Sequence, residues 1–202
     1  MKFLTILIFI LYVHFFPLVT LSQTTKEFAT KGIAKINSKD YAGAIADFDS
    51  AIKLDSTKDY YYDRGLAKSL VKDYDGAIQD YSKSISLNGN LKAYYMRGIS
   101  KENIKDYKNA LEDFDKSFEL KKDDPSFYFF RGNCKFKLKY LDAAMLDLNK
   151  AIELKPDYAS AYFIRAMVHI ELKQTTAACP DLQKAKDLND QYAEEFINKY
   201  CK

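Results

Sequence analysis

Small and apolar residues along the chain recur with a period of 33 or 34 residues. Twelve positions after a small residue comes an alanine, followed by a large apolar residue four positions later and a small residue three positions after that. The leading small residues are Gly32, Gly65, Gly98, Gly132 and Ala166, and the alanines are Ala44, Ala77, Ala110, Ala144 and Ala178. Positions i, i+4 and i+7 share one face of an α-helix, so this stripe predicts a helix in the second half of each period.

The first half of each period predicts a helix that packs against the one after it. An aromatic residue stands four positions before each leading small residue, which is again a helical spacing. These aromatics are Phe28, Tyr61, Tyr94, Tyr128 and Tyr162. A lysine and a polar residue separate the two halves, as at Lys39, Lys72 and Lys105. Because small residues on both helices allow a close approach, each period predicts a helical hairpin, and the constant period predicts a solenoid.

At these positions the chain resembles the tetratricopeptide repeat (TPR) family. The resemblance covers Thr25 to Asp190 and departs most in the last unit, where Ala166 replaces glycine, Thr175 replaces tyrosine, and Pro180 is accommodated if the second helix begins at Cys179. It implies an all-α, right-handed solenoid of five TPR-like helical hairpins with a C-terminal capping helix. The expected hairpins are residues 25–57, 58–90, 91–124, 125–158 and 159–190, and the expected cap is residues 191–202.

All four arginines of the chain occupy one position of the repeat, directly before the leading small residue, and Lys31 takes this position in the first unit. An aspartate follows each of these basic residues by 16 positions. In an antiparallel hairpin the two positions lie at similar heights, so we expect bidentate ion pairs with the aspartate of the same or a neighbouring unit. The expected pairs are Arg64 with Asp80, Arg97 with Asp113, Arg131 with Asp147, and Arg165 with Asp181. The alternative is an anion-binding stripe, since Lys68 and Lys72 share a helical face with Arg64.

A second apolar stripe runs along the first helices, beside the face that closes each hairpin. In TPR proteins the matching positions line a concave surface that accepts peptides or partner helices. The resemblance therefore implies a groove lined by Ala29, Ile33, Tyr62, Leu66, Tyr95, Ile99, Phe129, Asn133, Phe163 and Met167. The alternative is that these side chains pack against the helices of the adjacent unit. The lysine and asparagine pattern with which family members hold a C-terminal carboxylate is not reproduced, since Asn133 is an isolated asparagine in this column.

The first 22 residues have the layout of a secretory signal peptide. Lys2 precedes an apolar run that Pro17 interrupts, and Thr20 and Ser22 supply small residues before a cut at Gln23. We therefore expect an exported protein, periplasmic or secreted, in a compartment that allows disulfides. The alternative is an N-terminal membrane anchor that is not cleaved.

The C-terminal residues predict a capping helix, in which Ala193, Ile197 and Cys201 form one stripe. A solenoid needs such an element to cover its last apolar face. Cys179 and Cys201 are each 11 residues from Asp190, where the chain is expected to reverse, so they are brought to the same end. The sequence leaves two interpretations of this pair: a disulfide, or two small buried hydrophobic residues.

Composition narrows the range of functions. The net charge of +3 is too small to indicate nucleic-acid binding. The chain after the N-terminal segment has one histidine, His169, and Cys134 has no evident partner in the sequence. No cluster with metal-ligand spacing, no phosphate loop and no nucleotide motif is present. We therefore expect no enzyme activity, no metal and no cofactor.

Together these features predict a scaffold that binds a protein or peptide partner in the concave TPR groove. The alternative is a membrane-tethered structural scaffold that uses its convex face or self-associates, with membrane contact only through an uncleaved N-terminal segment. A third hypothesis, binding of an acidic polymer through the basic stripes, predicts a strong dependence on salt.

Overall fold

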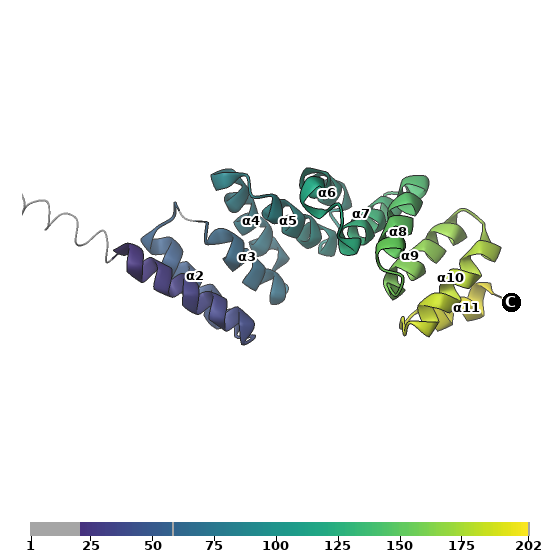
Figure 1. Ribbon diagram of the computed structural model, residues 1–202, viewed down its shortest axis with the longest axis horizontal. Coiled ribbons are helices and arrows are strands. Elements are labelled where there is room, and N and C mark those ends of the chain that lie inside the picture. Colours follow the sequence, from purple (N-terminus) through teal and green to yellow (C-terminus); the bar gives the residue numbers. More distant parts are fainter. Residues whose placement is uncertain (1–20, 58, 202) are drawn as a thin grey trace, which may run out of the picture. The chain divides into compact units, whose positions relative to one another are not determined.

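The structure is a computed structural model that describes residues 21–57 and 59–201. Within these two ranges the chain consists only of helices joined by short turns (Figure 1). The predicted all-α class is therefore confirmed. The predicted signal peptide, residues 1–22, lies outside the described residues apart from its last two positions.

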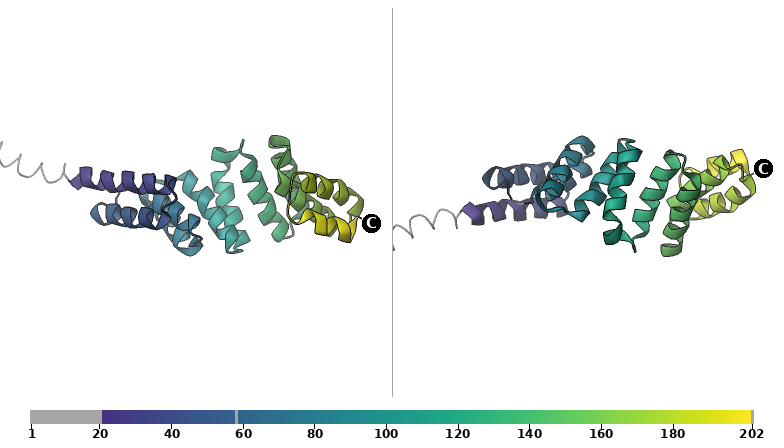
Figure 2. Two further views of the ribbon diagram at one scale, coloured as in Figure 1. Left: turned by 90° about the horizontal axis from the view of Figure 1, so that it is seen from below. Right: turned by 90° about the horizontal axis from the view of Figure 1, so that it is seen from above.

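The chain divides into two compact units, residues 1–93 and 94–202. The first unit contains a helix over residues 21–37, α2 (Tyr41–Leu54), α3 (Tyr61–Leu70) and α4 (Tyr74–Asn88). The boundary falls within α5 (Leu91–Asn103). The second unit continues with α6 (Tyr107–Lys121), α7 (Pro125–Lys137), α8 (Leu141–Leu154), α9 (Ala159–Glu171), α10 (Thr175–Asp187) and α11 (Ala193–Tyr200). Within each unit, helices that follow one another pack side by side, as α3 does with α4 and α7 with α8 (Figure 2).

The turn between the two helices of a hairpin is a helix C-cap with a lysine in the left-handed region. Lys72 has a φ of 64°. Its N–H donates to the carbonyl of Ser69 at 3.0 Å, and the N–H of Asp73 donates to the carbonyl of Lys68 at 2.9 Å. These two bonds form a Schellman motif, which satisfies carbonyls left free at the end of the helix. The equivalent lysines with positive φ are Lys39, Lys105, Lys139 and Lys173.

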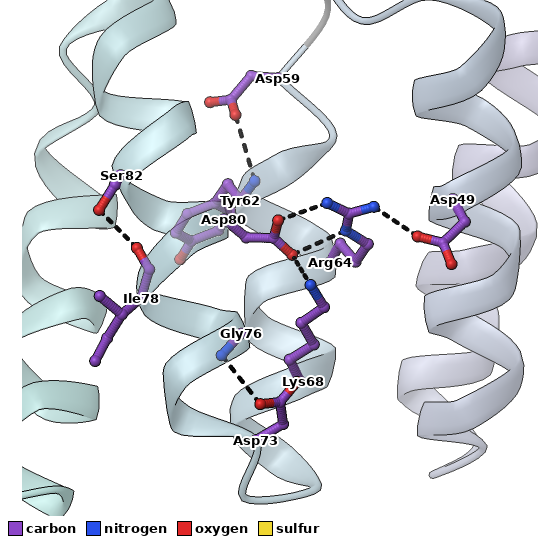
Figure 3. Close-up of polar contacts among 10 residues, drawn as sticks. All are labelled: Asp49, Asp59, Tyr62, Arg64, Lys68, Asp73, Gly76, Ile78, Asp80 and Ser82. Atoms are coloured by element: carbon purple, nitrogen blue, oxygen red, sulfur yellow. Dashed lines mark hydrogen bonds and ion pairs between the residues drawn. The ribbon is translucent and has the colours of Figure 1, made fainter.

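The residue after this lysine begins the next helix. The carboxylate of Asp73 accepts a hydrogen bond from the N–H of Gly76 at 3.0 Å (Figure 3), which makes it the N-cap of α4. Asp40 caps α2 in the same way, through the N–H of Gly43 at 3.0 Å. One lysine–aspartate pair therefore ends the first helix and starts the second, which explains how so short a link reverses the chain.

The leading small residue of a hairpin receives a large side chain from the facing helix. A Cβ atom added at Gly65 would lie 2.9 Å from Cε1 of Tyr81, which is closer than van der Waals contact, so the ring rests on bare backbone. In the last hairpin Ala166 takes the glycine's position and packs in one cluster with Leu182. A leucine in place of the ring leaves room for the alanine methyl group.

The start of α10 differs from the expectation. The helix begins at Thr175, so Pro180 lies inside it and not in the first turn that a start at Cys179 would give. Proline has no N–H to donate to the carbonyl one turn earlier, at Thr176. The helix nevertheless continues because Ala178 and Leu182, on either side of the proline, are buried in the core.

Candidate functional site

The arginine position lies where the first helix of a hairpin faces the second. Arg64 on α3 donates from Nε to Oδ2 of Asp80 at 2.8 Å and from Nη2 to Oδ1 at 2.6 Å (Figure 3). Asp80 on α4 is only 4% exposed, so the pair is largely shielded from water. Hydrogen bonding to Asp80 raises the pKa of Arg64 above its ordinary value. The guanidinium therefore stays charged.

The other three expected pairs have the same bidentate geometry. Arg97, Arg131 and Arg165 each donate from Nε and Nη2 to both oxygens of their aspartates, at 2.6 to 2.8 Å. The aromatic residue three positions earlier packs on the guanidinium, as Tyr61 does with its ring centroid 5.5 Å from Cζ of Arg64. This is a cation–π distance. The structure brings all four predicted arginine–aspartate pairs together.

Arg64 and Arg165 also reach the second helix of the preceding hairpin, a contact that the sequence analysis missed. Arg64 donates from Nη1 to Oδ1 of Asp49 on α2 at 2.6 Å (Figure 3). Arg165 donates from Nη1 to Oδ1 of Asn149 on α8 at 2.8 Å. We call the row of aspartates that lie 16 positions after the basic residues the aspartate ladder. A polar residue stands two positions after each ladder aspartate, and this was the signal in the sequence for the second contact. These polar residues are Asp49, Ser82, Asp115, Asn149 and Gln183. The arginine thus links successive hairpins as well as closing its own.

A lysine one turn after the arginine supplies a second cation to the same aspartate. Nζ of Lys68 lies 2.8 Å from Oδ2 of Asp80, and Lys101 and Lys135 make the equivalent contacts at 2.7 Å. The arginines and these lysines are therefore turned toward buried carboxylates of the protein itself, whereas Lys72 lies in the turn after α3 and does not share its helical face. This arrangement favours a structural role over the anion-binding alternative.

In the first unit, the predicted groove residues lie on the helix before α2 and on α3. Ile33 is 46% exposed, whereas Ala29 is buried and belongs to the core of this unit. Tyr62 and Leu66 are half-buried. The ring of Tyr62 has its centroid 5.9 Å from that of Tyr81. Ile33 is therefore more accessible to solvent than the two α3 residues.

In the second unit, predicted groove rings pack against neighbouring helices. Tyr95 is 7% exposed, and its ring centroid lies 6.0 Å from that of Phe114 and 6.4 Å from that of Phe127. The ring of Phe129 lies 4.9 Å from that of Tyr158, between centroids. For Tyr95 this is the packing role that the sequence analysis raised as the alternative.

The C-terminal helix covers the groove positions of the last hairpin. The rings of Phe163 on α9 and Phe196 on α11 meet edge to face with centroids 5.2 Å apart, and Met167 packs against the same cluster. Cys179 and Cys201 form a disulfide with a Cα–Cα distance of 5.7 Å, which ties α10 to the end of α11. Of the two interpretations open for this pair, the structure holds the disulfide.

The remaining groove positions, Ile99 and Asn133, lie near a glutamate that the sequence analysis did not single out. Glu102, at the end of α5, accepts a hydrogen bond from Nδ2 of Asn133 on α7 at 2.7 Å. Burial raises the pKa of Glu102 above its ordinary value, while the bond from Asn133 and the charge of Lys137 act in the opposite direction. Its equivalents in the other first helices are Ile36, Ser69, Phe136 and Ile170. A single charge in that column was the available signal.

The side chains with reactive chemistry are engaged in packing or local contacts. Cys134 is buried and free, and burial raises the pKa of its thiol to about 12. It is therefore a neutral thiol at physiological pH. His169 contacts Oε1 of Gln174 through Nδ1 at 2.9 Å. Over residues 21–57 and 59–201, no three histidine, cysteine, aspartate or glutamate side chains are grouped so that they could hold a metal ion.

Comparison with known families and structures agrees with this architecture. The profile of the tetratricopeptide repeat matches residues 59–90, 91–124, 125–158 and 159–192, which make up more than half of the chain. The chain belongs to the tetratricopeptide repeat family. None of the curated proteins matches the TPR chain at a significant level.

Solved structures share the fold of this TPR protein. YrrB, described as a TPR protein with an unusual peptide-binding site, has a TM-score of 0.77 at 22% identity, over 89% of this chain and 97% of YrrB. MamA from Desulfovibrio magneticus RS-1, residue 41 to the end, has a TM-score of 0.77 at 18% identity, over 82% of this chain and 94% of MamA. At such identities the likeness establishes the fold alone. The predicted family and the predicted solenoid class are confirmed.

Proposed function

We propose that this TPR protein is a non-enzymatic scaffold that binds a peptide or a partner helix along the accessible face of its first-position helices. TPR repeats generally mediate contacts between proteins. The peptide-binding site attributed to YrrB, which has the same fold, supports a peptide as the ligand class.

The observation that carries this proposal is the division of labour on the first helices. Their arginines and lysines form ion pairs with the aspartates of the ladder, whereas apolar residues on the adjacent helix face remain accessible to solvent. These residues are Ile33, Tyr62 and Leu66 in the first unit, and Ile99 and Phe129 in the second. Within each unit, accessible apolar residues on the same side of the first helices are typical of an interaction surface.

Two charge insertions test the proposal. Leu66→Glu and Ile99→Glu place a carboxylate on the proposed face of each unit, and Leu146→Glu, at a 72% exposed position of α8, is the control. Each purified variant is used to select from a randomised peptide library, with circular dichroism as the check on folding. We expect the first two variants to lose the peptides that the wild type enriches, and the control to keep them. Loss with Leu146→Glu alone would instead support binding by the second helices. Tyr95 is unsuitable for this test because its ring is part of the core.

We further propose that the protein is exported. The Cys179–Cys201 disulfide supports this location, since disulfides persist in oxidising compartments. None of the helices among the described residues is long and apolar enough to cross a membrane. Mass spectrometry of the protein recovered from its native compartment tests the proposal. A chain that begins at Gln23 and carries the disulfide is expected, whereas a chain that keeps Met1 favours the membrane-tethered alternative.

A further inference from the structure

Glu102 differs from the acids of the ladder in how its charge is compensated. Four of the five ladder aspartates, Asp80, Asp113, Asp147 and Asp181, are buried, and each of these four is bound by an arginine. Glu102 is also partly withdrawn from water, yet among the residues that the structure describes no lysine or arginine forms an ion pair with it. Lys137 is exposed and attracts it only from a greater distance. Withdrawing a charge from water is unfavourable unless a partner compensates for it.

Asn133 holds this carboxylate in place at a cost to the fold. Its side chain is 9% exposed, and Nδ2 donates to Oε1 of Glu102 at 2.7 Å. Oδ1 of Asn133 is buried and accepts no hydrogen bond within the described part of the chain. A buried acceptor without a donor is destabilising. The equivalent positions hold the apolar residues Ile33, Leu66, Ile99 and Met167. An asparagine here therefore indicates a role in orienting Glu102.

The neighbours of this pair are apolar and accessible. Ile99 lies three residues before Glu102 on α5, and Phe129 lies four residues before Asn133 on α7, so each shares a helix face with its partner. Both are half-buried, and both pack against the core of the second unit. The result is one oriented carboxylate next to two apolar side chains.

We propose that Glu102, oriented by Asn133, is a specificity subsite of the interaction face and takes a lysine or arginine side chain of the bound peptide. The aliphatic stem of such a residue packs on Ile99 and Phe129 while its cationic head meets the carboxylate. An arginine additionally places its guanidinium against the ring of Phe129.

This inference rests on the proposed function, and its test separates the two. The full chain, Glu102→Gln and Glu119→Gln are each used to select from the same randomised peptide library. Glu119 is an exposed acid on α6, so its substitution changes the net charge equally without touching the subsite. We expect the wild type and Glu119→Gln to enrich lysine or arginine at one position of the peptides, and Glu102→Gln to lose this preference. A synthetic peptide with the enriched sequence should bind Glu102→Gln about 10-fold more weakly.

Two further variants examine the orienting role. Asn133→Ala should weaken binding of the peptide that carries the lysine or arginine. Binding of the same peptide with glutamine in place of that basic residue should stay unchanged. Glu102→Lys should shift the enriched residue from a basic one to an acidic one. If the wild type enriches peptides without a basic preference, or Glu102→Gln binds the basic peptide equally well, the subsite is wrong while the scaffold function stands. If the wild type enriches no peptide, the proposed function itself is overturned.

Discussion

The first two hairpins of the chain place an aspartate at the same position of their second helices but bind it differently. Asp80 receives two hydrogen bonds from Arg64 and an ion pair from Lys68. Asp47 has Lys35 with Nζ at 2.8 Å from Oδ2, and that contact lacks hydrogen-bond geometry. Within residues 21–57 and 59–201, this buried oxygen of Asp47 accepts no hydrogen bond. Asp80 is therefore held by three polar contacts from the facing helix where Asp47 has one.

The difference follows from what each basic residue can reach. Arg64 also donates to Asp49 on the preceding hairpin, so its guanidinium serves two helices at once. Among the described residues no hairpin precedes the first, and Lys31, which takes the arginine position, lies over the ring of Phe28 at 5.7 Å from the centroid. A planar fork can bind acceptors on both sides of it at once, which a compact ammonium on a flexible stem does less well. The arginine is thus as much a link between hairpins as a clamp within one.

The largest effect is expected from removing Asp80, which has more polar contacts than Asp47. Asp80→Ala leaves the Arg64 and Lys68 cations without their buried partner, and we expect a loss of about 3–5 kcal/mol in the free energy of unfolding. Asp47→Ala removes a contact to the more exposed Lys35 and should cost at most about 1 kcal/mol. Urea unfolding followed by circular dichroism measures both. Equal losses would show that the arginine adds nothing to the lysine contact.

The other end of the chain is held by a covalent bond, and removing it extends the comparison. Cys201→Ser should lower the stability of the last hairpin by about 3 kcal/mol, the value typical of a short closed loop. Hydrogen exchange in α11 should accelerate, because an eight-residue helix is marginal without its anchor. Wild-type protein treated with a reductant is the matched control and should behave in the same way. Unchanged protection of α11 would mean that the packing of Phe196 suffices.

Glycine positions distinguish hairpins closed by a ring from those closed by leucine. Gly65→Ala brings a methyl group within 2.9 Å of the Tyr81 ring, so we expect a loss of about 1–3 kcal/mol from overpacking. At Gly132 the added atom meets Cβ of Asp147 and Cγ of Leu148, both at 3.2 Å, and Gly132→Ala should cost less than about 1 kcal/mol because these contacts are looser and a shift of a few tenths of an ångström relieves them. Thermal unfolding of the two variants decides this. The opposite order would contradict the steric account.

The smallest effect is expected from adding an arginine to the first hairpin. Lys31→Arg offers Asp47 the fork that Asp80 receives, and should raise the free energy of unfolding by about 0.5–1 kcal/mol. Lys26→Arg, at an exposed position of the same helix, is the control and should be neutral. No gain with Lys31→Arg would indicate that the arginine needs the preceding hairpin to be held in place.

The sequence was most informative where every unit obeys the same constraint. The 16-residue separation of arginine and aspartate predicted pairs that lie at bonding distance in four hairpins, because helix geometry alone puts the two positions opposite each other. The groove was less predictable. Tyr95 and Tyr62 occupy equivalent positions, yet Tyr95 is buried among Phe114 and Phe127 while Tyr62 is only half-buried. The exposure of each ring depends on the side chains of the neighbouring hairpin, and the residue pattern of a single repeat does not include them.

Isolated features were the hardest to predict. Glu102 and Asn133 occur once each in their columns, so no periodicity draws attention to them, and their hydrogen bond joins two different hairpins. The start of α10 was missed for a related reason. Local rules for Pro180 favoured a later start, but burial of Ala178 and Leu182 outweighs the missing hydrogen bond.

The sequence by itself determined the repeat, the helical hairpin and the partners within each hairpin, because these depend on spacings of a few to 16 residues along regular helices. Only the tertiary structure decided the second acceptors of Arg64 and Arg165, the burial of Tyr95 and the joining of Cys179 to Cys201. Those contacts lie outside a single hairpin, so they depend on the side chains of the hairpin or helix that packs next to it. The repeat pattern of the sequence describes what the hairpins share, whereas the contacts between hairpins depend on the residues in which they differ.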